Sequence, residues 1–142
     1  MASPAPIEIR DDASELLALL DGRGRMRLVS TGTRRRFGKG TVLMREGAPD
    51  EHTFYLILFG KVRVDARTAA GGTETMGEYK EGAIVGEIAA LLFERRTATV
   101  TAESDLELLA FEAEPALEIL ADYPKAMQAL TALAERRKAR RP

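Results

Sequence analysis

The stretch "VGEIAALLFERRTATV", residues 85–100, joins a Gly-Glu pair, a short apolar run and two adjacent arginines. Gly86 tolerates positive φ and lets the chain turn tightly out of a strand. The segment "EIAALL" that follows has helix propensity, but it has room for only about a turn and a half. A short helix that starts at a turn presents unpaired N–H groups to an anion. Arg96, at the start of the next strand, can face the same spot and bind a phosphate with two hydrogen bonds.

Glu87 cannot contact that phosphate favourably, because like charges repel. We therefore expect Glu87 to accept hydrogen bonds from neutral donors, for which sugar hydroxyls are the natural candidates. A phosphate beside a ribose hydroxyl describes a ligand of nucleotide size. Of two neighbouring strand residues only one can point into a pocket, and we expect this residue to be Arg96 and not Arg95.

The composition excludes several classes of function. The chain of 142 residues has a net charge of −1, so no global field draws it toward nucleic acid or an anionic membrane. It has no cysteine and one histidine, His52, which excludes disulfides, cysteine catalysis and zinc sites built from cysteines or several histidines. We find no set of residues for catalysis and expect neither an enzyme nor a metal site. Without a signal peptide or an apolar run of about 20 residues, we expect a cytoplasmic protein with no membrane span.

The pattern of turns predicts a mainly β fold. From about residue 30, short strands alternate with glycine-containing turns at the spacing typical of sandwiches, jelly rolls and barrels. The predicted strands are "TRRRF", "TVLMREG", "TFYLILFG", "KVRVDAR", "TETMGEY", "AIVGE", "TATVTAE" and "LELLAFE". We therefore expect an eight-stranded, jelly-roll-like β-roll over about residues 30–112.

Helices are expected on both sides of this roll. "SELLALL", residues 14–20, predicts a short N-terminal helix, and a further helical turn can follow near residues 26–29. After the roll, the prolines at 115 and 124 mark the starts of two C-terminal helices within residues 113–141. The second helix carries an apolar stripe that can pack on the roll, form a dimer seam or close over a ligand. We expect a flexible arm over residues 1–12 and a single domain over residues 13–142.

The opening stretch resembles the phosphate-binding cassette of the cyclic-nucleotide-binding domain family. In that cassette Gly-Glu, a small apolar helix and an arginine ten residues after the glycine follow one another. The similarity extends over about residues 14–140, since "VLMREG" resembles an early strand and turn of the family and "FYLILFGKVRV" its central hairpin. Val85 stands where the family often has an aromatic residue and Arg95 where it often has proline. These two residues are secondary site candidates.

The resemblance implies a site made of Gly86, Glu87, Ile88, Ala89, Arg96 and Thr97. Gly86 and the backbone amides of Ile88, Ala89 and Thr97 would surround the cyclic phosphate. Glu87 would bind the ribose 2′-hydroxyl and Arg96 the charged exocyclic oxygen. The Thr97 hydroxyl would lie near the phosphate and the purine, and a threonine here is associated with tolerance of guanine. Both cAMP and cGMP therefore remain candidate ligands.

These features predict a regulatory module that relays nucleotide occupancy through its C-terminal helices to a partner or a fused output domain. A protein partner or a homodimer through the last helix is expected. Direct DNA binding is not, because no helix-turn-helix follows that helix. The alternative is a protein-interaction domain that keeps the fold without binding nucleotide. The basic tail "ERRKARRP" is interpreted as charge suited to a helix C-terminus, where the macrodipole is negative.

Overall fold

The computed structural model describes residues 12–49, 52–92 and 94–142. The expected flexible arm therefore lies outside the described residues, except for Asp12. Asp12 is not part of a loose arm: it is buried, begins the first helix and accepts a hydrogen bond from the Ile84 amide at 3.0 Å.

The described chain forms five helices and eight strands. The helices are α1 (Asp12–Ala18), α2 (Gly22–Ser30), α3 (Glu87–Leu92), α4 (Ala113–Leu120) and α5 (Pro124–Ala139). The strands are β1 (Thr33–Phe37), β2 (Val42–Met44), β3 (Thr53–Phe59), β4 (Val62–Arg67), β5 (Thr73–Tyr79), β6 (Ile84–Val85), β7 (Thr99–Ala102) and β8 (Leu106–Glu112).

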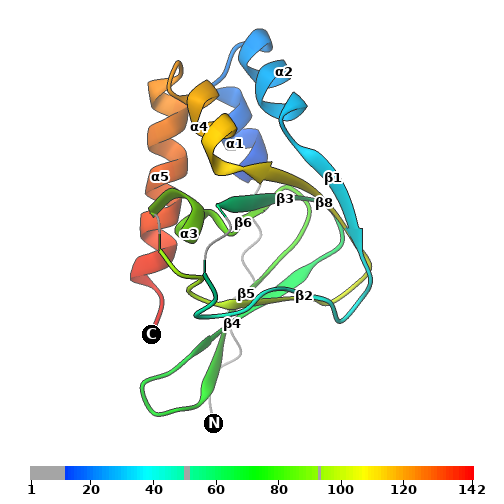
Figure 1. Cartoon of the computed structure of the whole chain (residues 1–142), viewed down its shortest axis with the longest axis vertical. Helices are drawn as coiled ribbons and strands as arrows, with labels where there is room; N and C mark the ends of the chain where they lie inside the picture. The colour runs from blue at the N-terminus through cyan, green and yellow to red at the C-terminus, as the bar shows by residue number, and fades with distance from the viewer. Residues whose placement is uncertain (1–11, 50–51, 93) are drawn as a thin grey trace.

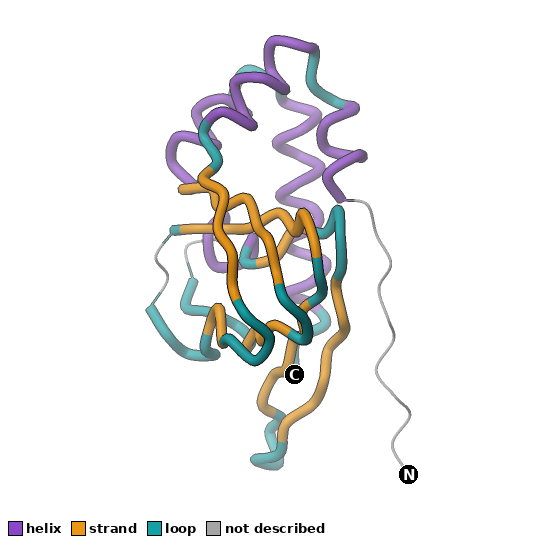
Figure 2. Tube along the Cα trace, turned by 90° about the vertical axis from the view of Figure 1, so that its right-hand side faces the viewer, coloured by secondary structure: helices purple, strands orange, loops and turns teal. Residues whose placement is uncertain are grey.

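The strands pair in two four-stranded antiparallel sheets, with the orders β1-β8-β3-β6 and β2-β7-β4-β5. This confirms the predicted β-roll with flanking helices. Figure 1 shows α1, α2 and α4 above the strands and α5 along one side, while the β4–β5 hairpin projects at the other end. In the perpendicular view of Figure 2 most of the helical segments again lie at one end of the molecule, and others run behind the strands.

One apolar core lies between the two sheets. Alternate residues of β4, Val62, Val64 and Ala66, are buried, and Ile57 and Leu108 enter the same core from β3 and β8. This period of two is what a strand with one buried face requires. Each fully buried aliphatic side chain of this size contributes roughly 1.5–3 kcal/mol to folding.

A second core joins the helices to the other face of the first sheet. Phe54 and Phe111 are directly opposite each other on β3 and β8, and their rings stack with centroids 5.2 Å apart. The apolar stripe of α5 is buried in this core through Ala126, Leu130 and Leu133. Of the three roles that the sequence left open for this stripe, the structure therefore shows packing within the chain. It also places α5 beside α3 (Figure 1).

The N-terminal side contains two helices where the sequence predicted one short helix and a possible further turn. α2 is a full helix because Asp21 caps it, accepting a hydrogen bond from the Gly24 amide at 2.7 Å. The Tyr123 hydroxyl donates to the same carboxylate at 2.7 Å, which fixes the cap against the α4–α5 connection. The Gly24 amide and the Tyr123 hydroxyl lower the pKa of Asp21.

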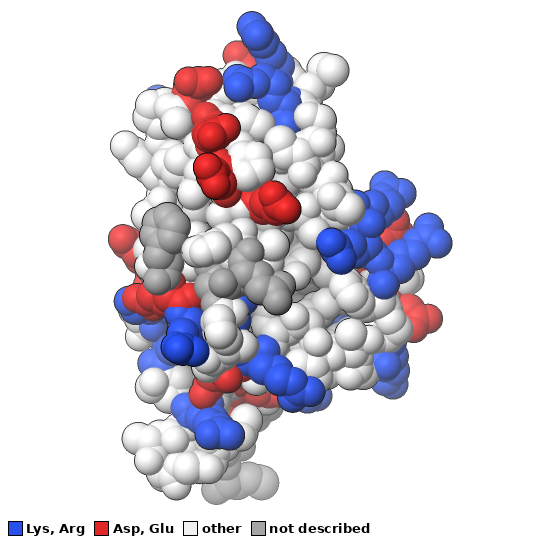
Figure 3. All heavy atoms as spheres, in the orientation of Figure 1, with Lys and Arg blue, Asp and Glu red and all other residues white. Residues whose placement is uncertain are grey.

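Strand β1 is the exposed edge of its sheet. Arg34 and Arg36 are largely exposed and approach Glu107 on β8, at 3.2 and 4.0 Å. Figure 3 shows basic side chains gathered on the side of the molecule where β1 lies, while acidic ones run over the part where α4 lies. Charged edge strands discourage pairing with other chains, which accounts for the "TRRRF" sequence.

Gly60 in the β3–β4 turn provides a test of this architecture. Its φ is 93°, and a Cβ there would lie 2.3 Å from the Asp105 carbonyl oxygen. Gly40 has a similar φ of 90° but open space around it. We expect Gly60→Ala to lower the free energy of unfolding by about 2–4 kcal/mol and Gly40→Ala by about 1 kcal/mol. Urea denaturation followed by circular dichroism measures both, and equal losses would contradict the close approach at Gly60.

Candidate functional site

The turn between β6 and α3 is built around Gly86. Its φ is 85°, in the region that glycine adopts without strain. A Cβ on Gly86 would lie 2.9 Å from Met44 Cε and 3.1 Å from Arg96 Nη1. Glycine therefore serves two purposes here: it turns the chain into α3 and it leaves room for a guanidinium against the turn.

Arg96 is buried beside this turn. Its Nη1 donates to the Gly86 carbonyl oxygen at 3.1 Å, and its Nη2 donates to the carbonyl and hydroxyl oxygens of Thr53 at 3.0 and 3.1 Å. Its neighbour Arg95 is exposed and donates to the Gly47 carbonyl oxygen at 3.1 Å. The structure thus places Arg96 toward the interior and Arg95 at the surface. Val85, the other secondary candidate, packs in the core between the sheets.

Glu87 begins α3 and is 2% exposed. Its carboxylate accepts a hydrogen bond from Arg137 Nη1 on α5 at 2.9 Å. Arg137 is itself 3% exposed, and its Nη2 donates to Asp12 on α1 at 2.9 Å. The same guanidinium donates to the Ile84 carbonyl oxygen and lies 4.6 Å from the centre of the Tyr79 ring. Glu87, which the sequence predicts to bind a sugar hydroxyl, therefore forms a buried ion pair in the structure.

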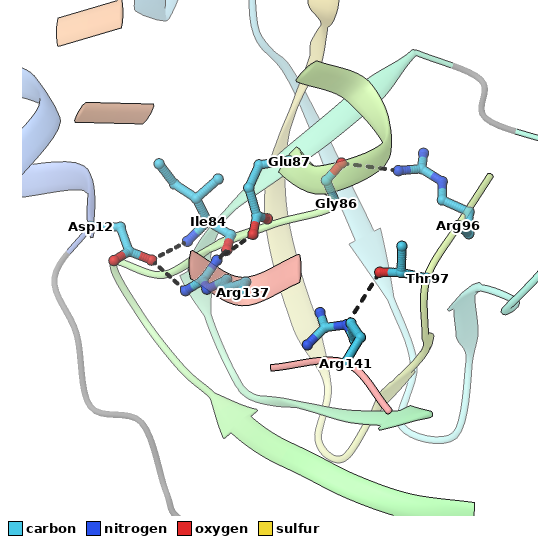
Figure 4. Close-up of polar contacts among 8 residues, drawn as sticks. All are labelled: Asp12, Ile84, Gly86, Glu87, Arg96, Thr97, Arg137 and Arg141. Carbon is cyan, nitrogen blue, oxygen red and sulfur yellow. Dashed lines mark hydrogen bonds and ion pairs between the residues drawn. The ribbon is translucent and has the colours of Figure 1, made fainter. Parts of the chain in front are cut away.

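The charge state of Arg137 follows from these neighbours. Burial alone lowers the pKa of its guanidinium, but attraction to Glu87, Tyr79 and Asp12 outweighs burial and raises that pKa above its ordinary value. Arg137 is therefore a permanent cation between two carboxylates. We call Asp12, Glu87 and Arg137 the buried triad; it joins α1, α3 and α5 (Figure 4).

Thr97 lies on the other side of the turn, where α5 ends. Its hydroxyl oxygen accepts a hydrogen bond from Nε of Arg141 at 3.2 Å. All six residues predicted for the site line one cavity of about 30 Å³, together with Met44 and Arg141. Ligand pockets for small molecules typically measure about 300–1,000 Å³. The candidate site is therefore assembled but closed, and Arg141, just beyond the end of α5, forms part of its wall (Figure 4).

Sequence reasoning missed the contribution of α5. The tail "ERRKARRP" was interpreted as charge that suits a helix end, whereas Arg137 is buried in the triad and Arg141 lines the cavity. The available signal was the position of Arg137, seven residues after Leu130 and thus on the apolar face of the helix. Within the described ranges there is no cluster of three or more residues suited to a metal ion. No described helix combines the length and apolar composition needed to cross a membrane.

The sequence matches the model of one protein family, described as the cyclic nucleotide-binding domain, over residues 34–123. Among curated proteins, a cGMP-dependent 3′,5′-cGMP phosphodiesterase A of Dictyostelium discoideum is 31% identical over 115 residues. That match covers 78% of this chain and 12% of the relative, so the chain spans a small part of that protein's length.

Solved structures show the same architecture. The catabolite activator protein of Thermus thermophilus is 28% identical with a TM-score of 0.77, covering 87% of this chain and 58% of that one. The regulatory domain of Toxoplasma gondii PKA with cAMP has a TM-score of 0.72 at 18% identity, covering 91% of this chain and 46% of that one. The second likeness concerns the fold alone.

The buried triad predicts a large effect on stability. Arg137→Met removes the cation and leaves two buried carboxylates uncompensated, which we expect to lower the free energy of unfolding by about 3–5 kcal/mol. Lys138→Met is the matched control, because Lys138 pairs with Glu94 at the surface and should cost about 1 kcal/mol or less. Urea denaturation measures both variants. A loss below about 1 kcal/mol for Arg137→Met would show that the triad does not stabilise the fold.

Proposed function

The chain belongs to the cyclic nucleotide-binding domain family, and on this premise we propose that it is a regulatory module for a cyclic purine nucleotide. The ligand is cAMP or cGMP, and occupancy is relayed through α5 to a partner protein or a fused output domain. The observation that carries the proposal is the shared cavity, which holds the turn, the buried arginine, the carboxylate and the threonine together.

The phosphate is assigned to the turn at Gly86. Arg96 supplies a buried cation whose fork of donors suits an anionic oxygen. The backbone N–H groups of Ile88 and Ala89, in the first turn of α3, have no hydrogen-bond acceptor within the helix. They point out of its N-terminal end, where the helix dipole is positive. In the structure Arg96 donates to neutral oxygens of Gly86 and Thr53, and these hydrogen bonds hold its side chain in place.

The ribose is assigned to Glu87. A buried carboxylate at the first position of α3 can accept hydrogen bonds from a sugar hydroxyl, and it lines the same cavity as Arg96. Because Glu87 also accepts from Arg137, a bound ribose would share or replace that interaction. Asp12 remains as a second acceptor for Arg137, so the cation need not be left unpaired when Glu87 turns to the ligand.

This shared carboxylate gives a physical basis for the relay. A cavity of about 30 Å³ cannot hold a nucleotide, so its wall, which includes Arg141, must rearrange when the ligand enters. Because Arg137 of α5 donates to Glu87, this rearrangement would also displace α5. The ligand shifts the population toward a state in which the end of α5 is displaced, by as much as its affinity for the two states differs. Helix α5 then presents a different surface to a partner or to a second copy of the chain.

The alternative function is a protein-interaction domain that binds no nucleotide. The specific observation in its favour is the closed site, in which Arg137 of α5 is the partner of Glu87 and Arg141, just beyond α5, is the partner of Thr97. In that case Arg137 would be a permanent structural element.

The choice between cAMP and cGMP is also open. The name of the Dictyostelium relative favours keeping cGMP as a candidate ligand.

The role of Arg96 can be tested by substitution. Arg96→Ala should weaken nucleotide binding by roughly 2–5 kcal/mol, because a buried phosphate would lose its cation. Arg95→Ala is the matched control and should change affinity little, since that side chain is exposed. Displacement of a fluorescent cyclic nucleotide measures both variants. Equal effects, or a larger effect at position 95, would refute the assignment of the phosphate to Arg96.

The relay can be tested by measuring a distance. The chain has no cysteine, so spin labels can be placed at Ala139→Cys, at the end of α5, and at Lys39→Cys on the roll without altering native thiols. Pulsed electron resonance should show this distance shifting by a few ångströms when a saturating cyclic nucleotide is added. A label pair within the roll, at Lys39→Cys and Thr73→Cys, should stay constant. An unchanged distance to α5 in nucleotide-bound protein would rule out the relay.

A further inference from the structure

A groove on the surface of α4 plays no part in the candidate nucleotide site. It measures about 610 Å³ and shares no residue with the cavity around Gly86. Half-buried Leu117 and Ala121 give it an apolar lining. Three exposed glutamates also line it, namely Glu112, Glu114 and Glu118. We call Leu117 and these three glutamates the acidic groove.

The charge of this groove is not compensated within the chain. None of its three glutamates forms an ion pair with the residues that the structure describes. The helix dipole favours Glu114 in the first turn of α4, but Glu118 lies near the negative end of the helix. Glu114 and Glu118 are four residues apart, a spacing at which like charges repel. The charge of Glu118 therefore does not favour the folding of α4, and a cation from outside would relieve the repulsion.

A surface of opposite charge lies at the other end of β8. There Glu107 is paired with Arg36 of β1 on one side and with Phe59 of β3 on the other, and the three line one hollow of about 450 Å³. Phe59 is 59% exposed, and no other aromatic side chain in the described ranges is exposed. Arg34 and Arg36 share the single carboxylate of Glu107, so positive charge is in excess. We call Arg34, Arg36 and Phe59 the basic patch.

The acidic groove and the basic patch cannot meet within one molecule. Glu107 and Glu112 are five residues apart on β8, which corresponds to about 17 Å along an extended strand. Figure 3 shows the basic side chains on the side where β1 lies, apart from the acidic ones over α4. The charges of the two surfaces can therefore neutralise each other only between two copies of the chain.

We propose that the acidic groove docks the basic patch of a second copy of this chain, with Phe59 against Leu117 and the two arginines beside the glutamates. Burial of the phenyl ring favours the contact, and the opposite charges set its orientation. Because the two surfaces differ and lie apart, the contact is head-to-tail and links copies in a row or a ring. The arginines that keep β1 from pairing as a strand remain available, since this contact uses side chains and not the backbone. Neither surface contains a residue of the candidate nucleotide site, so failure of this contact would leave the proposed function untouched.

Sedimentation velocity of the full chain, without nucleotide, tests the contact. We expect the weight-average mass to rise above that of one chain over a roughly hundredfold range of concentration that reaches the millimolar range. About 1 M NaCl should reverse part of this rise, because it shortens the Debye length to about 3 Å. Arg36→Glu and Glu118→Arg should each weaken association by roughly tenfold, since each brings like charges together. Phe59→Ser keeps the charges and should weaken association by about fivefold through lost apolar contact.

An equimolar mixture of the Arg36→Glu and Glu118→Arg variants is the sharpest test. In the mixture the intact groove of the first variant meets the intact patch of the second, and the two altered surfaces again carry opposite charges. Association should therefore return to near the wild-type level, a recovery that misfolding of either variant cannot produce. Arg35→Glu is the matched control and should change association little, because Arg35 lies on the same strand but alternates to its other face.

The remaining outcomes would overturn the inference. A chain that stays monomeric over the whole range would do so, and so would association that the three substitutions leave unchanged, because the contact would then lie elsewhere. Failure of the mixture to recover would also overturn it, provided that circular dichroism shows both variants to be folded. Binding of a synthetic peptide of alternating arginine and phenylalanine to a chain that stays monomeric would replace the second copy by a basic segment of another protein.

Discussion

The burial of the Arg137 guanidinium is the constraint on which the arrangement of helices depends. A charge removed from water costs several kcal/mol unless partners surround it. Arg137 is 3% exposed and meets this requirement because Asp12 and Glu87 lie on either side at 2.9 Å, with the Ile84 carbonyl oxygen and the Tyr79 ring beside them. Helices α1, α3 and α5 must therefore keep their relative positions as long as the triad is intact. Since we also assign the proposed ribose contact to Glu87, one carboxylate would serve both the packing and the site.

The ion pair between Glu87 and Arg137 closes one side of the candidate site, while the residues around Gly86 keep their arrangement. Gly86 and Arg96 keep their geometry through backbone and side-chain bonds that do not involve α5. The face near Glu87 and Thr97 is occupied by Arg137 of α5 and by Arg141, just beyond that helix. A ligand would thus meet a rigid half, made by the roll, and a movable half, made by the last helix. Such a division is what a sensor needs to turn binding into displacement.

Much of the fold follows from local patterns in the sequence. Glycine turns and alternating strands predict the eight-stranded roll, and the spacing of Gly86 and Arg96 indicates a shared site because one turn and one short helix separate them. The triad has no such local signal, since Arg137 is 50 positions from Glu87 and 125 from Asp12. A charge-rich tail is equally compatible with a solvated helix end. Only tertiary packing decides that one arginine of this tail faces inward.

The most direct test of this account is calorimetric titration of the wild-type chain, unfolded and refolded to remove any co-purified nucleotide, with cAMP and with cGMP. The account predicts saturable binding of one nucleotide per chain, with a dissociation constant in the micromolar range or below for at least one of the two. Flat titrations with both nucleotides, on a chain whose circular dichroism shows it to be folded, would contradict it. The closed site around Glu87 would then be the permanent state of an interaction domain.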